Sequence, residues 1–289
     1  MTVRIPARKA SVGAAEVRRV LPHHAARKVG PWVFLDHFGP HERTATREGD
    51  VLPHPHCGIS TVSYLFRGQV EHRDSTGGHA IVRPGEIHWM RAGHGVVHSE
   101  RAPEAMLGRR SVSHGLQLWC AHADGEEEQA PAFGSWSDLP TLDIEGRAVH
   151  LLAGNGWGAE SPVSTTSNLV YAMVELKAGE SLSLPDHEER CVYPVAGRVA
   201  VAGSVSAEFE MLVAESGPQR VEAITDATVA ILGGDPIGKR FMWWNLVHSD
   251  RDRLAEQARR WRARGFPSIP GDDEAFIPAP SGPDIARMK

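Results

Sequence analysis

A repeated pattern limits how this chain of 289 residues can fold. Residues 64–70 and 193–199 share the spacing Tyr-x-x-x-Gly-x-Val, about 130 residues apart. In each copy, an apolar β-forming segment leads into a glycine turn and then into a second β-forming segment. The repeat therefore predicts two copies of one β-unit within the chain.

The remaining sequence also predicts mostly β structure. Short runs of Val, Ile, Leu, Thr and Tyr are separated by turns, which draw on 29 glycines and 20 prolines. Only residues 250–264 have the pattern of an amphipathic helix, with Leu254, Ala258 and Trp261 on one face. We expect the arginines of this helix to form a solvated face, and the acidic runs 126–128 and 272–274 to lie in solvated loops. The fold class predicted is all-β, of the barrel or sandwich type, with one short C-terminal helix.

Composition narrows the class of function. The formal net charge of −5 and the lack of a basic block argue against direct nucleic-acid binding. The first residues lack the apolar core of a signal peptide, and no apolar run is long enough to span a bilayer. Cys57, Cys120 and Cys191 are far apart and odd in number, which predicts reduced, packed thiols. We expect a cytoplasmic protein that does not contact membranes.

Thirteen of the 16 histidines lie at or before His122, so any imidazole chemistry belongs to the first unit. Two strings stand out, Pro53-His54-Pro55-His56 and His98-Ser99-Glu100. Side chains at i and i+2 of an extended segment lie on one face, so each string can direct two ligands to one point. Three imidazoles and a carboxylate suit a divalent transition metal: iron, nickel, manganese, cobalt, copper or zinc. The alternative is that these are surface histidines on unrelated strands.

Other histidines offer weaker candidates. His88 could replace His98 as a ligand in a different strand register, and His94 could line the mouth of the pocket or simply be an exposed turn residue. By the repeat offset, Ser183 and Pro185 occupy the positions of the first histidine pair in the second copy. The second copy is therefore not expected to bind a metal, and His187 nearby is expected to be solvated or to cap a turn.

Several motifs taken together resemble the pirin family of bicupins, over nearly the whole chain. They are Gly30-Pro31-Trp32-Val33-Phe34-Leu35-Asp36-His37-Phe38-Gly39-Pro40, Pro53-His54-Pro55-His56-x-Gly58, the segments 89–100 and 114–119, and the C-terminal stretches 243–245, 266–267 and 270–278. The resemblance implies two cupin barrels packed face to face, with a metal in the N-terminal barrel only. The implied ligands are His54, His56, His98 and Glu100. Where such sequences commonly place a glutamate four residues after the second histidine, this chain has Ser60, which could change the surroundings of the metal.

With this resemblance, the chain is expected to divide into four parts. These are a metal-binding cupin (1–130), a connecting segment (131–165), a degenerate cupin without metal (166–240) and a C-terminal helix with an extended tail (241–289).

The resemblance also implies a function. Some pirin-like proteins are quercetin 2,3-dioxygenases, so the expected partners are an aromatic small molecule and O2. The expected cofactor is one divalent metal, with Fe(II) favoured, and Glu100 would act as both ligand and proton acceptor. One alternative is a non-catalytic, metal-dependent regulator that senses redox state and binds a protein partner. A weaker one is a 2-oxoglutarate-type oxygenase that uses His98, Glu100 and a distal His114 or His150.

Overall fold

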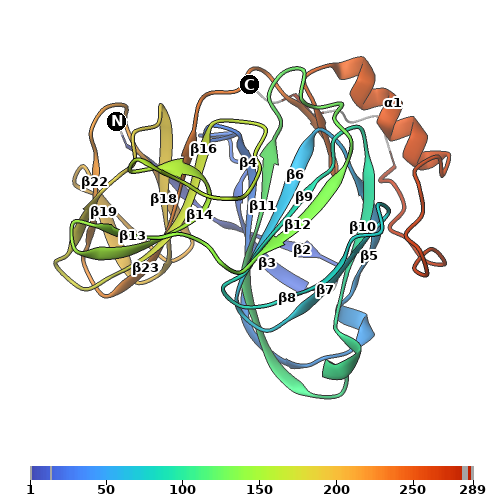
Figure 1. The fold of residues 1–289 in the computed structure, drawn as a ribbon, viewed down its shortest axis with the longest axis horizontal. Helices are drawn as coiled ribbons and strands as arrows, with labels where there is room; N and C mark the ends of the chain where they lie inside the picture. The colour runs from blue at the N-terminus through green and yellow to red at the C-terminus, as the bar shows by residue number, and fades with distance from the viewer. Residues whose placement is uncertain (1, 14, 282–285, 288–289) are drawn as a thin grey trace. The chain divides into compact units, whose positions relative to one another are not determined.

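The computed structural model describes residues 2–13, 15–281 and 286–287, and the regular structure in them is mostly antiparallel strand with one α-helix (Figure 1). Contacts divide the chain into two units. One contains residues up to 9, 18–36 and 138–237, and the other contains 10–17, 37–137 and those from 238 onward. The predicted mostly-β fold with a single helix is confirmed. The four boundaries expected from the sequence stay a prediction.

The unit that carries most histidines is built around two sheets, although residues 8–9, 18–21 and 32–36 of the larger sheet fall within the bounds of the other unit. A seven-stranded sheet has the order β12-β9-β6-β11-β4-β3-β2, and a four-stranded sheet has the order β5-β10-β7-β8. In chain order the strands are β2 (Arg8–Val12), β3 (Ala15–Leu21), β4 (Trp32–Thr44), β5 (Val51–His56), β6 (Ile59–Arg67), β7 (Val70–Asp74), β8 (His79–Val82), β9 (Ile87–Arg91), β10 (Val96–Arg101), β11 (Arg110–Ala121) and β12 (Ala132–Trp136).

The other unit is built from the same kind of parts, an eight-stranded sheet and a four-stranded sheet. The larger sheet has the order β1-β21-β18-β23-β16-β14-β13 with β15 paired to β14, and the smaller has the order β17-β22-β19-β20. Buried Val, Leu and Ile side chains fill the space that the sheets enclose. The strands are β1 (Val3–Pro6), β13 (Thr141–Ile144), β14 (Arg147–Gly156), β15 (Ala159–Glu160), β16 (Leu169–Leu176), β17 (Ser181–Ser183), β18 (Glu189–Ala196), β19 (Arg198–Val201), β20 (Ser204–Ala207), β21 (Glu210–Val213), β22 (Arg220–Ala223) and β23 (Ala227–Gly234).

A C-terminal segment covers the outer side of the four-stranded sheet in the histidine-rich unit. It contains β24 (Phe241–Trp243), β25 (Leu246–His248), β26 (Ala286–Arg287) and the helix α1 (Arg251–Arg262). The carboxylate of Asp250 accepts hydrogen bonds from the first turn of α1, as an N-cap does. Leu254, Ala258 and Trp261 pack in one apolar cluster with Cys57 and Val97, which are next to the predicted ligands in sequence. The predicted helix and its apolar face are confirmed.

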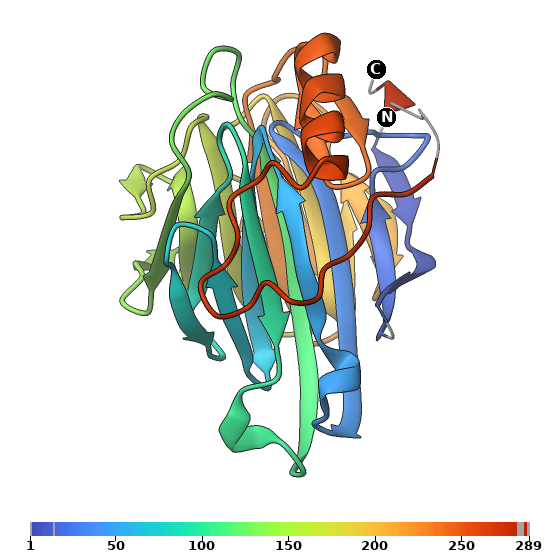
Figure 2. The same cartoon turned by 90° about the vertical axis from the view of Figure 1, so that its right-hand side faces the viewer.

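The tail beyond α1 crosses the outside of the strands that carry the predicted ligands (Figure 2). Asp272 accepts hydrogen bonds from Ser99 and Arg101 of β10, and the backbone N–H of Ile277 donates to the carbonyl of Pro53 in β5. The sequence-based view of residues 272–274 as a solvated acidic loop is therefore wrong for its first member. The tail holds β5 and β10 from the side opposite the histidines.

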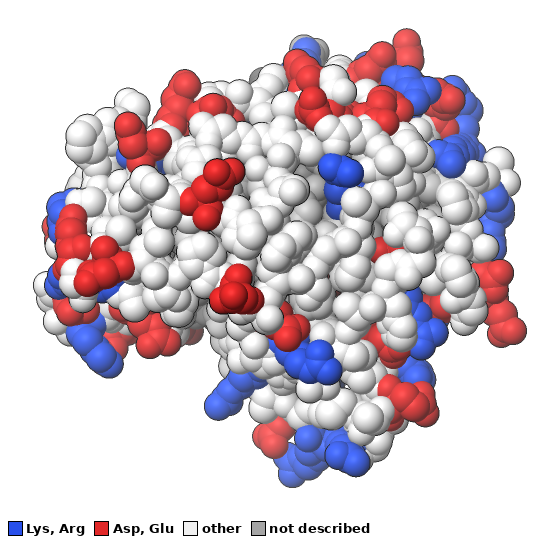
Figure 3. Space-filling view, viewed as in Figure 1, with Lys and Arg blue, Asp and Glu red and all other residues white. Residues whose placement is uncertain are grey.

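The charged surface is mixed. On the face drawn in Figure 3, acidic and basic side chains are interspersed between wide uncharged areas. Among the described residues, no helix combines the length and the apolar character needed to cross a bilayer. All three cysteines are free and buried, as predicted.

Candidate metal centre

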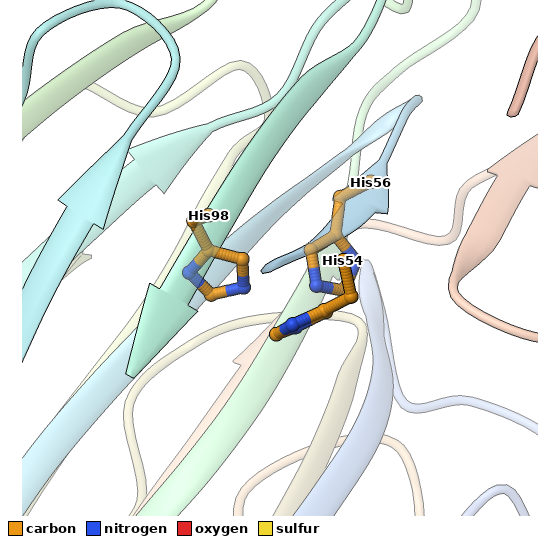
Figure 4. A group of neighbouring side chains, drawn as sticks. All are labelled: His54, His56 and His98. Carbon is orange, nitrogen blue, oxygen red and sulfur yellow. The ribbon is translucent and has the colours of Figure 1, made fainter. Parts of the chain in front are cut away.

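Three of the predicted ligands come together on two neighbouring strands. β5 and β10 pair antiparallel, with His54 directly opposite His98 and His56 opposite Val96. The ligand nitrogens of His54, His56 and His98 all lie within 4.8 Å of one another, and the three rings turn toward a common point (Figure 4). Their ring centroids are 4.3 to 5.1 Å apart. The i, i+2 spacing in the sequence predicted these same three histidines.

The local sequence explains how β5 can hold two such side chains. This strand lies at the edge of its sheet, where Pro53 and Pro55 are tolerated because no described strand pairs with its outer side. After the histidines, Gly58 has φ +66°, and a Cβ there would lie 2.0 Å from the carbonyl oxygen of Val247. Glycine is therefore required at this position for β25 to approach. That approach places the carbonyl of Asn245 against His56.

The histidines are kept neutral. They are only 1–6% exposed, and burial is the main reason that the pKa of each is lowered, to about 4 for His54 and well below 6.5 for His56 and His98. A metal binds the neutral imidazole through a lone pair, so these groups are ready to act as ligands at neutral pH.

Hydrogen bonds also determine which nitrogen is available. The Nδ1 of His54 lies 2.8 Å from the carbonyl oxygen of Leu52, and the Nδ1 of His56 lies 2.9 Å from that of Asn245. A carbonyl can only accept, so Nδ1 carries the proton in both rings and the lone pair is on Nε2. Both Nε2 atoms are thus left as acceptors for a cation.

The buried ring nitrogen of His98 shows whether a metal ion suits this site. The Nε2 of His98 is fully buried and has no hydrogen-bond partner among the described residues. A buried polar atom normally has a partner, and an exception calls for an explanation such as an ion. Three neutral imidazoles around one point, one with a lone pair that nothing satisfies, form a donor set suited to a borderline divalent transition metal. The side chains present therefore fit such an ion.

Glu100 stands apart from this cluster. The pairing of β10 with β5 shifts between His98 and Glu100, so that Glu100 lies opposite Val51, and it is not among the residues whose ligand atoms lie within 4.8 Å of one another. Burial raises the pKa of Glu100 to about 7. The histidine part of the predicted set is brought together, whereas the assignment of Glu100 as the fourth ligand stays a prediction.

The alternative histidines lie elsewhere. His88 is hydrogen-bonded to Glu86 and Ser135, and His114 lies 2.8 Å from the Nε2 of His37. His150 is on β14 of the other unit, beside Thr141. Neither His114 nor His150 belongs to the three-histidine group, which leaves the 2-oxoglutarate-type triad without its distal ligand.

The second β-unit has no imidazole at the two positions that the repeat offset picks out, which are Ser183 and Pro185. Nε2 of His187 donates to the carbonyl oxygen of Asn155 at 2.8 Å, and the residue is buried, so of its two expected roles the solvated one is wrong. It therefore holds a loop of its own unit together.

Ser60 faces away from the cluster. On β11, Trp119 pairs with Thr61 and Cys120 pairs with Ser60. The ring of Trp119 lies 5.1 Å from that of His56, and paired residues of antiparallel strands share a face, so Thr61 is on the metal side. Ser60 is on the opposite side, 3.0 Å from Nε2 of the buried His122. The structure therefore gives Ser60 a packing role, in place of the expected effect on the metal's surroundings.

Sequence reasoning missed the residues that orient the ligands. Two of them are backbone carbonyls, at Leu52 and Asn245, which leave no mark in a sequence. Sequence reasoning also missed His72, whose Nδ1 lies 3.5 Å from that of His98. Its string, His72-Arg73-Asp74, has the same i, i+2 spacing as the ligand strings and could have been found.

Two barrel-like units, with a histidine centre in one of them, define the class as a bicupin with a candidate mononuclear metal site. Residues 14–120 match the pirin family model, and residues 171–267 match the pirin C-terminal cupin domain. The chain is 42% identical to a pirin-like protein of Caulobacter vibrioides over 95% of this chain and 97% of that one. This chain belongs to the pirin family.

Solved structures agree with this assignment. A quercetin 2,3-dioxygenase from Acinetobacter baumannii matches with a TM-score of 0.89 and 30% identity, over 98% of this chain and 96% of the other. A bacterial pirin from Escherichia coli, solved in complex with nickel(II), matches with a TM-score of 0.66 over 82% of this chain and all of its own length. At 17% identity, the second match shows the shared fold alone.

Proposed function

We propose that this protein is a metal-dependent dioxygenase that opens a flavonol such as quercetin with O2 and releases carbon monoxide. The observation that carries the proposal is the buried group of three neutral histidines, with the unsatisfied Nε2 of His98 directed into it. A structural relative named quercetin 2,3-dioxygenase, which covers 98% of this chain, supports the choice of substrate. The products together contain every atom of the flavonol and of O2, so no further reductant is needed.

The chain's own residues have separate tasks. His54, His56 and His98 would hold the ion, which we propose to be Fe(II) and which would act as a Lewis acid toward the 3-hydroxyl oxygen of the flavonol. Glu100, with a pKa raised to about 7 by burial, would accept the proton of that hydroxyl at neutral pH. Trp119, which is 7% exposed and contacts His56, would help to keep bulk water from the centre.

The experiment uses the full-length protein loaded with Fe(II) without oxygen. Quercetin and air are then added, and the loss of flavonol absorbance, oxygen uptake and carbon monoxide are followed together. His56→Ala and Glu100→Ala should remove turnover, whereas His187→Ala in the other unit should retain it. Free Fe(II) at the same concentration controls for uncatalysed oxidation. Turnover that persists in both variants of the centre would rule out the proposal.

In a second candidate function, the same metal centre is present but catalyses no reaction. Family members that regulate partner proteins would need the metal only to shape a binding surface. In that case the metal-loaded protein would bind Fe(II) with the same three histidines but would produce no carbon monoxide from quercetin. The assay above therefore separates the two functions.

A further inference from the structure

The three histidines of the centre are oriented in two different ways. His54 and His56 each place Nδ1 against a backbone carbonyl, but His98 places Nδ1 against another side chain, that of His72. We propose that His72 and Asp74 are positioning residues that hold His98 in the tautomer a metal ligand requires. This inference rests on the proposed metal centre, and its test separates the two.

The side chains of His98, His72 and Asp74 contact one another in that order. β7 pairs with β10 so that Asp74 lies opposite His98, and His72 is on the same face two residues earlier. The Nε2 of His72 lies 3.1 Å from Oδ2 of Asp74, while its Nδ1 lies 3.5 Å from Nδ1 of His98. The ring of Phe133 stacks on His72 at 4.2 Å and 6°, which holds the imidazole plane. Both His72 and Asp74 are buried.

The direction of each hydrogen bond follows from Asp74. Three donors, from Thr76 and Gly78, meet Oδ1 of Asp74, and a carboxylate can only accept, so Oδ2 takes a hydrogen bond from His72. His72 must then carry its proton on Nε2 and offer a lone pair at Nδ1. His98 donates from Nδ1 to that lone pair, and its own lone pair is left on Nε2. This is the atom that lacks a partner in the centre.

The other oxygen of Asp74 makes the arrangement testable. Oδ1 accepts from the backbone N–H of Thr76 at 2.7 Å, from the Thr76 hydroxyl at 2.6 Å and from the N–H of Gly78 at 3.0 Å. In Asp74→Asn, the amide oxygen would stay with these three donors, because an NH2 group there would face them. The new NH2 group would then point at His72.

The substitution Asp74→Asn would reverse the direction of both hydrogen bonds, the one between residue 74 and His72 and the one between His72 and His98. His72 would accept at Nε2 and carry its proton on Nδ1, so His98 would have to accept at Nδ1. The proton of His98 would move to Nε2, where it would occupy the position that a metal needs. A neutral substitution of similar size is thus expected to do more harm to metal binding than removal of the side chain, because Asp74→Ala leaves His72 free to donate from either nitrogen.

The first measurement is metal affinity. Fe(II), and separately Ni(II), is titrated without oxygen against a competing chelator, and the free energy of unfolding is measured alongside. Asp74→Asn should weaken binding by about 10- to 100-fold, and Asp74→Ala by less, even if Asp74→Ala unfolds more easily. A merely structural role would give the opposite order. His88→Gln is the matched control, because His88 also pairs with a carboxylate, Glu86, and also lies beside Phe133 at 5.9 Å.

The second measurement needs no metal. Long-range proton–nitrogen NMR spectra of the metal-free protein report the tautomer of each histidine ring. His98 should carry its proton on Nδ1 in the parent protein and in His88→Gln, and on Nε2 in Asp74→Asn. An unchanged tautomer or an unchanged affinity in Asp74→Asn would overturn the inference. If the parent protein binds no metal, the proposed function fails, and the NMR result still decides the inference.

Discussion

The two units use the same kind of strand pair in opposite ways. In one unit, His54 lies opposite His98, and both side chains are buried, neutral and directed at a common point. In the other, Ser183 lies opposite Arg220, whose guanidinium pairs with Glu145 at 2.6 Å on the exposed surface. The fold supplies the paired strands in both cases. The side chains on these strands differ. In one unit they are buried, with a ring nitrogen that lacks a hydrogen-bond partner among the described residues, and in the other they are exposed and paired. Function therefore depends on the site and not on the fold.

The largest effect that separates the units should come from His56→Ala. Removal of one of three nitrogen ligands should weaken binding of Ni(II) or Fe(II) by more than about 100-fold, because the remaining two imidazoles cannot enclose the ion. Titration calorimetry without oxygen measures the change. Pro185→Ala, at the equivalent position of the other unit, should leave the affinity unaltered. Equal losses in both variants would contradict the comparison.

The pH dependence of stability should reveal the buried neutral histidines. An unfolded histidine binds its proton near pH 6.5, but folded His54 does so only near pH 4, so the unfolded state binds more protons between these values. The free energy of unfolding should therefore fall as the pH falls through this window, by about 3 kcal/mol for His54 alone. His56, His98 and His122 act in the same direction, and Glu100, whose pKa is raised, acts in the opposite one.

Chemical denaturation of the metal-free protein between pH 7 and pH 5 measures this slope. His150→Gln, an exposed histidine of the other unit, should retain it, whereas His122→Gln should reduce it. A slope of zero in the parent protein would mean that the histidines are not held neutral. Saturation with a metal should add stability at pH 7, by about 2.7 kcal/mol when free metal is a hundred times the Kd.

Ser60→Ala should change stability and leave the metal alone. The hydroxyl is the hydrogen-bond partner of Nε2 in the buried His122, so its loss should cost about 1–3 kcal/mol in the free energy of unfolding. The affinity for Ni(II) should equal that of the parent protein, because Ser60 lies on the face away from the cluster. A weakened affinity without loss of stability would show that the position does contact the centre.

The smallest effect should come from Arg220→Ala. Its ion pair with Glu145 is exposed, and such pairs are screened by water and contribute little. Thermal unfolding should therefore be close to that of the parent protein, and metal affinity should be unchanged. A large loss of stability would show that the polar pair of this unit is as critical as the histidines of the other.

Much of the fold and the core of the site follow from local sequence patterns. The repeat predicted two β-units, and the i, i+2 spacing selected His54, His56 and His98, because strand geometry places such side chains on one face. Three neighbouring features depended on long-range pairing. The register of β6 with β11 turns Ser60 away from the histidines, the shift in β10 separates Glu100 from them, and β25 brings the carbonyl of Asn245 to His56. None of these can be obtained from spacing along the chain.

The acidic runs also differ from what the sequence predicted. Glu127, expected in a solvated loop, is buried and accepts hydrogen bonds from the backbone and side chain of Ser249. Together with Asp272 it ties the C-terminal segment to the histidine-rich unit. Composition alone cannot show this, because a charge run is solvated or buried according to the partner that the fold brings to it.

The central claim is that three neutral histidines hold one metal ion through Nε2. Long-range proton–nitrogen NMR spectra of the full-length protein, recorded before and after one equivalent of Zn(II) as a diamagnetic probe, test it most directly. We predict that the Nε2 signals of His54, His56 and His98 shift together and that those of His150 and His187 stay in place. Shifts that miss any of the three histidines, or that need a second equivalent of metal, would contradict the account.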